Sequence, residues 1–499
     1  MLFGEGRRPA ARRQETNEDE NPDAWHNGCP AATRDKGVPV RFPLNNTFIF
    51  LFGALGGMLF GFDTGIISGA SPLIESDFQL NAAQTGFITS SVLIGSMIGA
   101  LTIGGLSDKY GRKKLLIVSS LLFLVGSALS ATATGFVWMV AARILLGLAV
   151  GAASALTPAY LAELAPKERR GSLSTLFQLM VTLGILLAYL SNLGFLDRDL
   201  LGWDDWRWML ASALIPSALL LLGGLLLPES PRYLVKQGDM RNAFKVLQLI
   251  RKDMDAAEVT AELDEIERVA SSERAQRQGG VKELFTTARP AIIAAVGIML
   301  FQQLVGINSV IYFLPQVFIK GFGFPESQAI WVSVGIGVVN FLSTIVATLF
   351  MDRFNRKTVL VFGSVVMAVS LVALALLNFL GDVSNAAVPT MVLIAVYILG
   401  FAVSWGPLAW VMIGEIFPLS VRGIGTSIGS AANWIGNFVV SQFFLMLLAA
   451  FGNNVGGPFA IFAVFAVLSI PFVLRFVPET KGKSLEQIEA ELVGRGASK

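Results

Sequence analysis

The sequence holds few of the residues that enzymes and metalloproteins use for chemistry. It has one cysteine, Cys29, and one histidine, His26. A single cysteine excludes an internal disulfide framework and a cysteine-built metal site. Because His26 lies in a polar N-terminal stretch, the rest of the chain has no histidine for zinc binding or acid–base catalysis. We therefore expect no enzyme activity, no metal and no cofactor.

Charged residues are scarce as well. They make up 15% of the 499 residues, against 54% hydrophobic residues, and the net charge is only +2. A soluble globular chain carries about a quarter charged residues. The composition therefore predicts a membrane protein surrounded by the lipid bilayer, and we expect no nucleic-acid partner.

Long apolar runs dominate what is present. A helix needs about 20 mainly apolar residues to cross a bilayer, and twelve such segments are predicted, at 47–70, 87–106, 115–134, 136–160, 172–192, 208–227, 290–319, 328–351, 358–381, 388–413, 424–450 and 457–476. Loops after the even-numbered segments are rich in lysine and arginine, whereas those after the odd-numbered ones contain only Arg198, Arg207 and Lys320. The positive-inside rule then predicts a multi-pass protein of the cell membrane with both termini in the cytoplasm.

The chain also repeats itself. Charged boxes at Asp108 and Glu163 return in the same order at Asp352 and Glu415. Such a repeat predicts an all-α protein of two parallel six-helix halves around a central cavity. The predicted parts are a polar, disordered tail at 1–46, a six-helix half at 47–227, a cytoplasmic linker with short helices at 228–289, a second six-helix half at 290–477 and a cytoplasmic tail at 478–499.

Several motifs occur together at these positions. They include "GGLSDKYGRKK", "PESPRYL", "QQLVGIN", "GEIFPLSVRG" and "PETKGKSLEQI". On these motifs the chain resembles the sugar porters of the major facilitator superfamily, most closely bacterial glucose/proton symporters, from about Phe48 to Leu492. The resemblance implies the major facilitator fold with twelve transmembrane helices. It also implies a sugar and protons as partners, and we expect a monomer.

Two ionisable residues lie away from the ends of the predicted spans, Asp63 in the first and Arg143 in the fourth. At about 1.5 Å per residue they reach similar depths, so they can pair. Burial favours the neutral form of a carboxyl group, whereas a nearby guanidinium favours the ionised form. A changing distance between them would therefore couple proton binding to conformation. The alternative is a permanent structural ion pair. In the family that the chain resembles, the aspartate matching Asp63 is the proton site of symporters.

Binding a sugar requires amides that both donate and accept hydrogen bonds, together with aromatic surfaces. Such residues match sugar-contacting or cavity-lining positions of the family: Gln178, Gln302, Gln303, Asn308, Tyr312, Asn340, Trp410, Asn433, Trp434 and Asn437. The alternative is that membrane amides hold helices together. Gly306 and the pair Gly406-Pro407 interrupt the seventh and tenth spans, which predicts gate helices or, alternatively, static kinks.

Charged residues of both signs cluster at the predicted cytoplasmic ends of the spans. We predict that they form a latch that joins the halves while the outer entrance is open. Its members are Asp108, Arg112, Glu163, Arg170, Asp352, Arg356, Glu415 and Arg422. Ordinary positive-inside anchoring is the alternative, and it accounts for the arginines but not for the acids.

The sequence thus predicts a proton-coupled symporter that imports a hexose, with glucose as the first candidate, by alternating access. A proton-coupled pentose or polyol transporter and a uniporting facilitator are the alternatives within transporters. A membrane protein that senses a sugar without transporting it is the alternative from another class.

Overall fold

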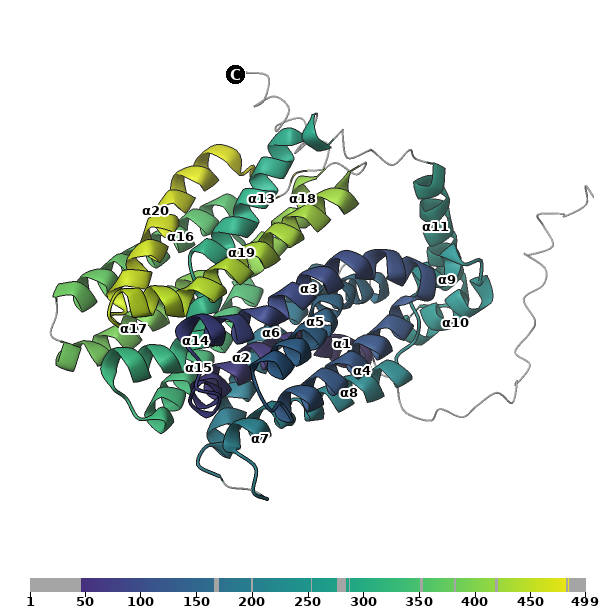
Figure 1. The fold of residues 1–499 in the computed structure, drawn as a ribbon. Helices are drawn as coiled ribbons and strands as arrows, with labels where there is room; N and C mark the ends of the chain where they lie inside the picture. Colours follow the sequence, from purple (N-terminus) through teal and green to yellow (C-terminus); the bar gives the residue numbers. More distant parts are fainter. Residues whose placement is uncertain are drawn as a thin grey trace, which may run out of the picture. The chain divides into compact units, whose positions relative to one another are not determined.

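The computed structural model describes residues 46–483, apart from gaps at 166–169, 199–200, 253, 276–283, 287, 351–352, 381–382, 418–420 and 482. The tail predicted at 1–46 therefore lies almost wholly outside the described residues, as does most of the tail predicted at 478–499. The described elements are α-helices, and a helix stands at each of the twelve predicted spans (Figure 1).

The first group of helices, called the N-terminal half, runs from α1 to α8. Its members are α1 (Asn46–Gly53), α2 (Leu55–Asp77), α3 (Ala82–Tyr110), α4 (Arg112–Ala131), α5 (Phe136–Leu164), α6 (Arg170–Phe195), α7 (Asp205–Ser212) and α8 (Leu214–Leu226). Three linker helices follow, α9 (Pro231–Lys236), α10 (Met240–Ile250) and α11 (Ala256–Ala275).

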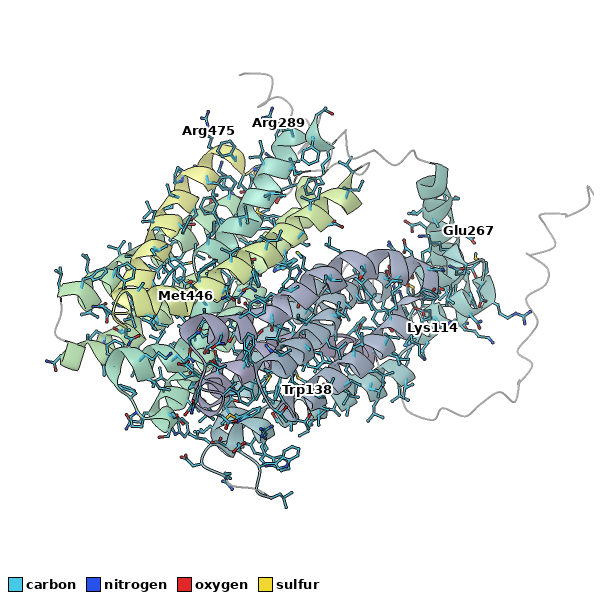
Figure 2. All side chains as sticks on the ribbon, viewed as in Figure 1. Lys114, Trp138, Glu267, Arg289, Met446 and Arg475 are labelled. Atoms are coloured by element: carbon cyan, nitrogen blue, oxygen red, sulfur yellow. The ribbon has the colours of Figure 1, made fainter. Side chains whose placement is uncertain are left out.

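The second group, called the C-terminal half, runs from α13 to α20. Its members are α13 (Arg289–Leu304), α14 (Ile307–Phe322), α15 (Glu326–Phe350), α16 (Arg356–Leu380), α17 (Val383–Ala402), α18 (Trp405–Ile416), α19 (Arg422–Ala450) and α20 (Gly456–Phe476). Arg289 and Arg475 mark neighbouring ends of α13 and α20 (Figure 2).

Helix pairing repeats from one half to the other. In the N-terminal half α2 packs on α6, α3 on α5 and α4 on α8, and the corresponding pairs of the C-terminal half are α13 with α19, α15 with α17 and α16 with α20. The most extensive contacts between the halves join α2 with α14, α6 with α15 and α3 with α19. The sequence repeat therefore corresponds to a repeat of packing, with the shared cavity between these joining pairs.

Eleven helical segments of the described chain are long and apolar enough to cross a membrane. The remaining predicted span is α1–α2, where glycines and Asp63 lower the hydropathy. Almost every residue of α2 from Leu55 to Ser71 is buried within the protein, so this helix needs little lipid-facing apolar surface. It also runs to Asp77, beyond the predicted end at residue 70, because the polar residues of its last turns contact protein.

Glycines let several of these helices approach closely. A Cβ atom at Gly151 of α5 would lie 1.9 Å from the carbonyl oxygen of Ser96 in α3, and one at Gly147 would lie 2.0 Å from that of Val92. Gly147 and Gly151 therefore serve close helix packing. Gly61 performs the same role between α2 and α6, where a Cβ atom would lie 1.8 Å from the Val181 carbonyl oxygen.

Candidate functional site

The two charges predicted to meet do meet. The Arg143 guanidinium of α5 donates to both carboxylate oxygens of Asp63 in α2, and the Nη2–Oδ2 distance is 3.3 Å. The side chains are 0% and 5% exposed, respectively. Arg143 Nε is buried and has no hydrogen-bond partner among the residues that the structure describes. A charge pair this deep is costly to desolvate, which favours a functional reason for it.

Tyr312 of α14 lies near this ion pair. Its side chain is 2% exposed, and its hydroxyl lies beside Thr64 of α2 and Asn437 of α19, close to Asp63. Thr64 and Asn437 line the central cavity, whereas Tyr312 itself does not. The structure thus places Tyr312 behind the cavity wall, in contact with the surroundings of the ion pair.

A central cavity lies between the halves. The N-terminal half contributes residues of α2 and α6, and the C-terminal half contributes residues of α13, α14, α15, α17, α18 and α19. Nine of the ten predicted sugar residues line it: Gln178, Gln302, Gln303, Asn308, Asn340, Trp410, Asn433, Trp434 and Asn437.

The amides on the C-terminal wall form a connected chain. Asn308 Nδ2 donates to Gln303 Oε1 at 2.8 Å, and Gln303 Nε2 donates to Asn433 Oδ1 at 3.3 Å. Asn433 Nδ2 in turn donates to Gln302 Oε1 at 2.6 Å. The alternative function of these amides, holding helices together, therefore operates in this conformation. The same groups face the cavity, so a polar ligand can exchange with these bonds.

Both predicted helix interruptions are present. Gly306 separates α13 from α14 with a φ of 90°, which favours glycine. Ser404 separates α17 from α18. Gln302 Nε2 donates to the carbonyl oxygens of Trp405 at 3.0 Å and Gly406 at 3.3 Å, so an amide of one broken helix satisfies backbone at the other break.

Sequence reasoning did not select several other cavity residues. Thr182 and Thr344 each lie four residues, or one helical turn, after the predicted amides Gln178 and Asn340. A search for polar residues at that spacing would have found them. The missed residues that line the cavity are Phe60, Thr64, Val181, Thr182, Ile307, Ile311, Thr344, Phe401 and Ala402.

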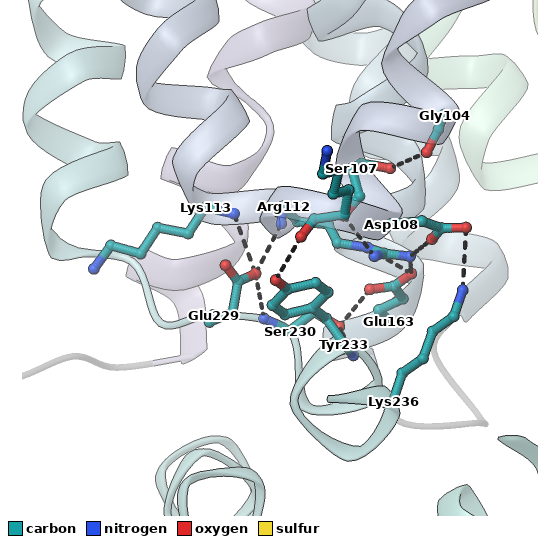
Figure 3. A network of polar contacts seen from close by, with 11 residues as sticks. Gly104, Ser107, Asp108, Arg112, Lys113, Glu163, Glu229, Ser230, Tyr233 and Lys236 are labelled. Carbon is teal, nitrogen blue, oxygen red and sulfur yellow. Dashed lines mark hydrogen bonds and ion pairs between the residues drawn. The ribbon is translucent and has the colours of Figure 1, made fainter. Parts of the chain in front are cut away.

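The predicted latch residues pair within each half. In the N-terminal half, Arg112 donates to Glu163 at 3.0 and 3.2 Å and to Asp108 at 3.1 Å (Figure 3). In the C-terminal half, Arg356 Nη1 lies 2.8 Å from Glu415 Oε2. Asp352 and the side chain of Arg170 fall outside the described part. Arg422 begins α19 and makes further contacts of its own.

Two acids that sequence reasoning missed complete these networks. Glu229 accepts hydrogen bonds from the backbone N–H groups of Arg112 at 2.9 Å and Lys113 at 3.2 Å (Figure 3). Glu479 accepts from those of Arg356 and Lys357, both at 3.1 Å. Each carboxylate therefore caps a helix N-terminus, of α4 and α16 respectively. The Pro-Glu pair repeated in "PESPR" and "PETKG" was the signal in the sequence.

The two sides of the helix bundle differ in how the halves meet. We call the side where α3 and α5 end, next to α9, the linker side, and the opposite side, where α2 and α14 end, the loop side. On the loop side, Lys320 Nζ lies 2.7 Å from Glu75 Oε1 across the halves. A hollow lined by Ser107, Thr426 and other residues of both halves lies toward the linker side and shares Trp410 and Trp434 with the central cavity.

Comparison with known proteins agrees with this geometry. Residues 49–492 match the family described as "Sugar (and other) transporter". The chain is 45% identical to a D-xylose transporter of Levilactobacillus brevis over 89% of this chain and 95% of that protein. It is 40% identical to the glucose transporter GlcP of Staphylococcus epidermidis, over 90% and 97%. It is 38% identical to the galactose-proton symporter of Escherichia coli, over 89% and 94%.

Solved structures give the same result. The proton:xylose symporter XylE bound to 6-bromo-6-deoxy-D-glucose is 33% identical, with a TM-score of 0.75 and coverage of 90% of this chain and 99% of that one. XylE from E. coli in its inward-open conformation is 32% identical, also with a TM-score of 0.75, over 90% and 100%.

Fold and relatives together define a multi-pass membrane transporter with the twelve-helix major facilitator fold, and not an enzyme. The chain belongs to the sugar transporter family of the major facilitator superfamily.

Proposed function

We propose that this protein is a proton-coupled symporter that imports a hexose, with glucose as the first candidate, across the cell membrane by alternating access. One observation carries the proposal. A buried carboxylate–guanidinium pair, Asp63 and Arg143, lies next to a cavity lined by amides and tryptophans from both halves. The relative named as a galactose-proton symporter and the proton:xylose symporter XylE support a proton as the coupling ion.

In this proposal the linker side faces the cytoplasm, as do both termini. The basic loops at that side support the orientation through the positive-inside rule. The structure then corresponds to an inward-facing conformation, because contacts join the halves on the loop side and the cavity meets a hollow on the linker side. In the outward-facing conformation, the latch joins the halves on the linker side instead. Its members are Asp108, Arg112, Glu163, Arg170, Asp352, Arg356, Glu415 and Arg422.

The proposed proton site is the Asp63 carboxylate. A proton on it neutralises the charge that Arg143 binds, so the pair weakens and α2 and α5 gain freedom to move relative to each other. Tyr312 lies beside Asp63 and beside two cavity residues, Thr64 and Asn437. Sugar bound in the cavity therefore has a short path of contacts by which to affect the carboxylate, as coupling between two sites requires.

The proposed sugar site is the central cavity. Sugar hydroxyls would replace part of the bonding among Gln303, Asn308 and Asn433, while Trp410 and Trp434 offer apolar surface to the ring. The side chains of Gln178 and Asn340 make no hydrogen bond within the described part of the chain, so both are available to a ligand. Tyr312 contributes from behind the wall rather than by contact.

A pentose is the second candidate, because the relative with 45% identity is a D-xylose transporter. A pentose lacks the exocyclic CH₂OH group of a hexose. Discrimination therefore depends on the small space next to that group, where one extra methylene changes binding by about 1–3 kcal/mol.

The test is uptake of a panel of labelled hexoses, pentoses and polyols into proteoliposomes, with and without a protonophore. We expect glucose to accumulate against its gradient and the protonophore to abolish that accumulation. Asp63→Asn should lose accumulation but retain exchange across the membrane, since a neutral residue cannot release a proton. Asp77→Asn, at the exposed end of the same helix, is the matched control and should accumulate sugar normally.

Each alternative has its own outcome in this experiment. Accumulation by Asp63→Asn would contradict the proton assignment. Accumulation of xylose but not glucose would show that the substrate is a pentose rather than a hexose. Sugar binding without counterflow would identify a sensor, and uptake that never exceeds equilibrium in the wild type would identify a uniporter.

A further inference from the structure

Pro315 lies inside α14, the helix whose end joins the two halves on the loop side. Proline has no backbone N–H, so the carbonyl of the residue four positions earlier, Ile311, has no helical donor. Phe313, between them, has non-helical backbone angles of φ −115° and ψ 15°. A buried carbonyl without a partner is unfavourable, which raises the question of what satisfies it.

The donor comes from the other half of the protein. The Tyr189 hydroxyl of α6 donates to the Ile311 carbonyl oxygen at 2.9 Å. Tyr189 is 1% exposed, and its ring packs so closely on α15 that a Cβ atom at Gly337 would lie 2.9 Å from Tyr189 Cδ2. The ring is therefore held in place, and the hydroxyl is aimed at the break in α14.

The same helix makes further contacts with the N-terminal half toward its end. Gln316 Nε2 donates to Glu75 at 2.9 Å and to Ser71 at 3.3 Å, and Lys320 pairs with Glu75. The pair of Lys320 and Glu75 is partly exposed, and the bond from Gln316 to Ser71 is buried. The bond from Tyr189 lies further along α14, at the level of the cavity, which Ile311 lines. Outward opening requires α14 to leave α2 and α6, so each of these contacts must break.

We propose that Tyr189 is a positioning residue for transport, which holds the proline break of α14 against α6 and so stabilises the conformation that is closed on the loop side. The inference rests on the proposed alternating access. Its specific content is that the bond exists because Pro315 leaves a carbonyl free, so the role of Tyr189 depends on the residue at position 315.

The experiment measures the ratio of loop-side-open to loop-side-closed protein. Spin labels are placed at Ser76→Cys in α2 and Gln328→Cys in α15, both exposed and one in each half, in a Cys29→Ser background. Pulsed electron paramagnetic resonance then gives the populations of long and short label distances in nanodiscs without sugar.

Tyr189→Phe removes the hydroxyl and keeps the ring. We expect the open-to-closed ratio to rise about fivefold, the factor that corresponds to one neutral hydrogen bond. The matched control is Tyr397→Phe. Tyr397 donates to the Val305 carbonyl at 2.8 Å at the other interruption of this span, between α13 and α14, and both residues belong to the C-terminal half. Its removal should leave the ratio unchanged. An unchanged ratio in Tyr189→Phe, or an equal shift in Tyr397→Phe, would overturn the proposal.

Pro315→Ala provides a second test that leaves Tyr189 intact. The new N–H can satisfy the Ile311 carbonyl within α14, so the ratio should rise severalfold. In that background Tyr189→Phe should add less than about a twofold change. An equal effect of Tyr189→Phe with proline and with alanine at position 315 would show that the carbonyl is not the reason for the bond.

These populations are measured without any transport assay. A protein that never accumulates sugar with protons would contradict the proposed function, yet the dependence of Tyr189→Phe on position 315 would still decide the role of this bond. Conversely, normal proton-driven uptake by the wild type would support the proposed function. An unchanged open-to-closed ratio in Tyr189→Phe would still contradict the inference about Tyr189.

Discussion

The two walls of the central cavity are built differently. The N-terminal wall comes from α2 and α6, and behind it lie the charges Asp63 and Arg143. The C-terminal wall contains the connected amides and two interrupted spans, α13–α14 and α17–α18, but the described part of that half holds no buried ion pair of this depth. The proposed function thus assigns proton chemistry to the N-terminal half and sugar recognition mainly to the C-terminal half.

This division has a physical basis. A buried charge pair needs rigid, fully packed surroundings, because any unpaired state in low dielectric is costly. Glycines pack α2 directly against the backbone of α6, and α2 has no break near Asp63. A sugar site instead needs many exchangeable hydrogen bonds, and interrupted helices supply backbone and amide groups at the cavity. Tyr312 belongs to the C-terminal half, and its hydroxyl lies beside Thr64 and close to Asp63 of the N-terminal half.

The largest predicted effect concerns the buried ion pair behind the N-terminal wall. Arg143→Gln leaves the Asp63 carboxylate buried without its partner, so the protein should lose about 3–5 kcal/mol of stability. Proton-driven accumulation should also disappear. The double variant with Asp63→Asn should recover the stability but not the accumulation. Thermal unfolding in detergent and sugar uptake measure the two effects, and an unaltered melting temperature in Arg143→Gln would contradict a stabilising pair.

The second prediction concerns the amide wall. Gln303→Ala should weaken sugar binding by about 1–3 kcal/mol, since it removes an amide that bonds Asn308 and Asn433. Binding of protons should change little. Calorimetric titration of sugar checks the affinity. Asn378→Ala, which removes a buried amide of the same half that bonds Thr390 outside the cavity, serves as the control and should retain wild-type affinity.

The third prediction tests the link between the walls. Tyr312→Phe removes one hydroxyl beside Thr64, Asn437 and Asp63. We expect sugar affinity within about twofold of wild type, but an accumulation ratio about fivefold lower, because coupling between two sites is typically about 1–3 kcal/mol. Paired measurements of binding and of accumulation separate these outcomes. Equal losses in both would assign Tyr312 to direct sugar contact.

The smallest predicted effect lies at the loop side. Lys320→Gln removes a partly exposed ion pair with Glu75, and such pairs contribute less than about 1 kcal/mol. The open-to-closed ratio should therefore rise only about twofold, and high salt should reduce the difference. Lys320→Arg should restore the wild-type ratio. If Lys320→Gln raised the open-to-closed ratio more than Tyr189→Phe does, the main contact between the halves on the loop side would be the partly exposed ion pair.

Much of the fold was readable because it follows from burial in lipid. Twelve apolar runs, basic loops and a repeated motif predicted the spans and their division, and helices stand at all twelve positions. The predicted first span ends at residue 70, because a charged residue such as Glu75 usually marks a loop. In the structure Glu75 lies within α2 and pairs with Lys320. The pairing of Asp63 with Arg143 was predictable because few other charges lie at that depth.

Other features depend on contacts between residues that are distant in the sequence. Tyr312 was expected among the sugar ligands, and only packing places it behind the cavity wall. The bond from Tyr189 to the Ile311 carbonyl joins residues 122 positions apart, and no local pattern indicates it. The latch residues pair within each half in this conformation, so their contact between halves remains a prediction.

The amino-acid sequence alone determined which side chains lie deep in the membrane, because the cost of burying charge and amide groups leaves so few of them there. It also indicated the interruptions of two spans, at Gly306 and next to Gly406-Pro407. Only the tertiary structure decided which of these groups meet across the halves. Hydrogen bonds depend on distances of about 3 Å, and helix packing rather than composition sets those distances.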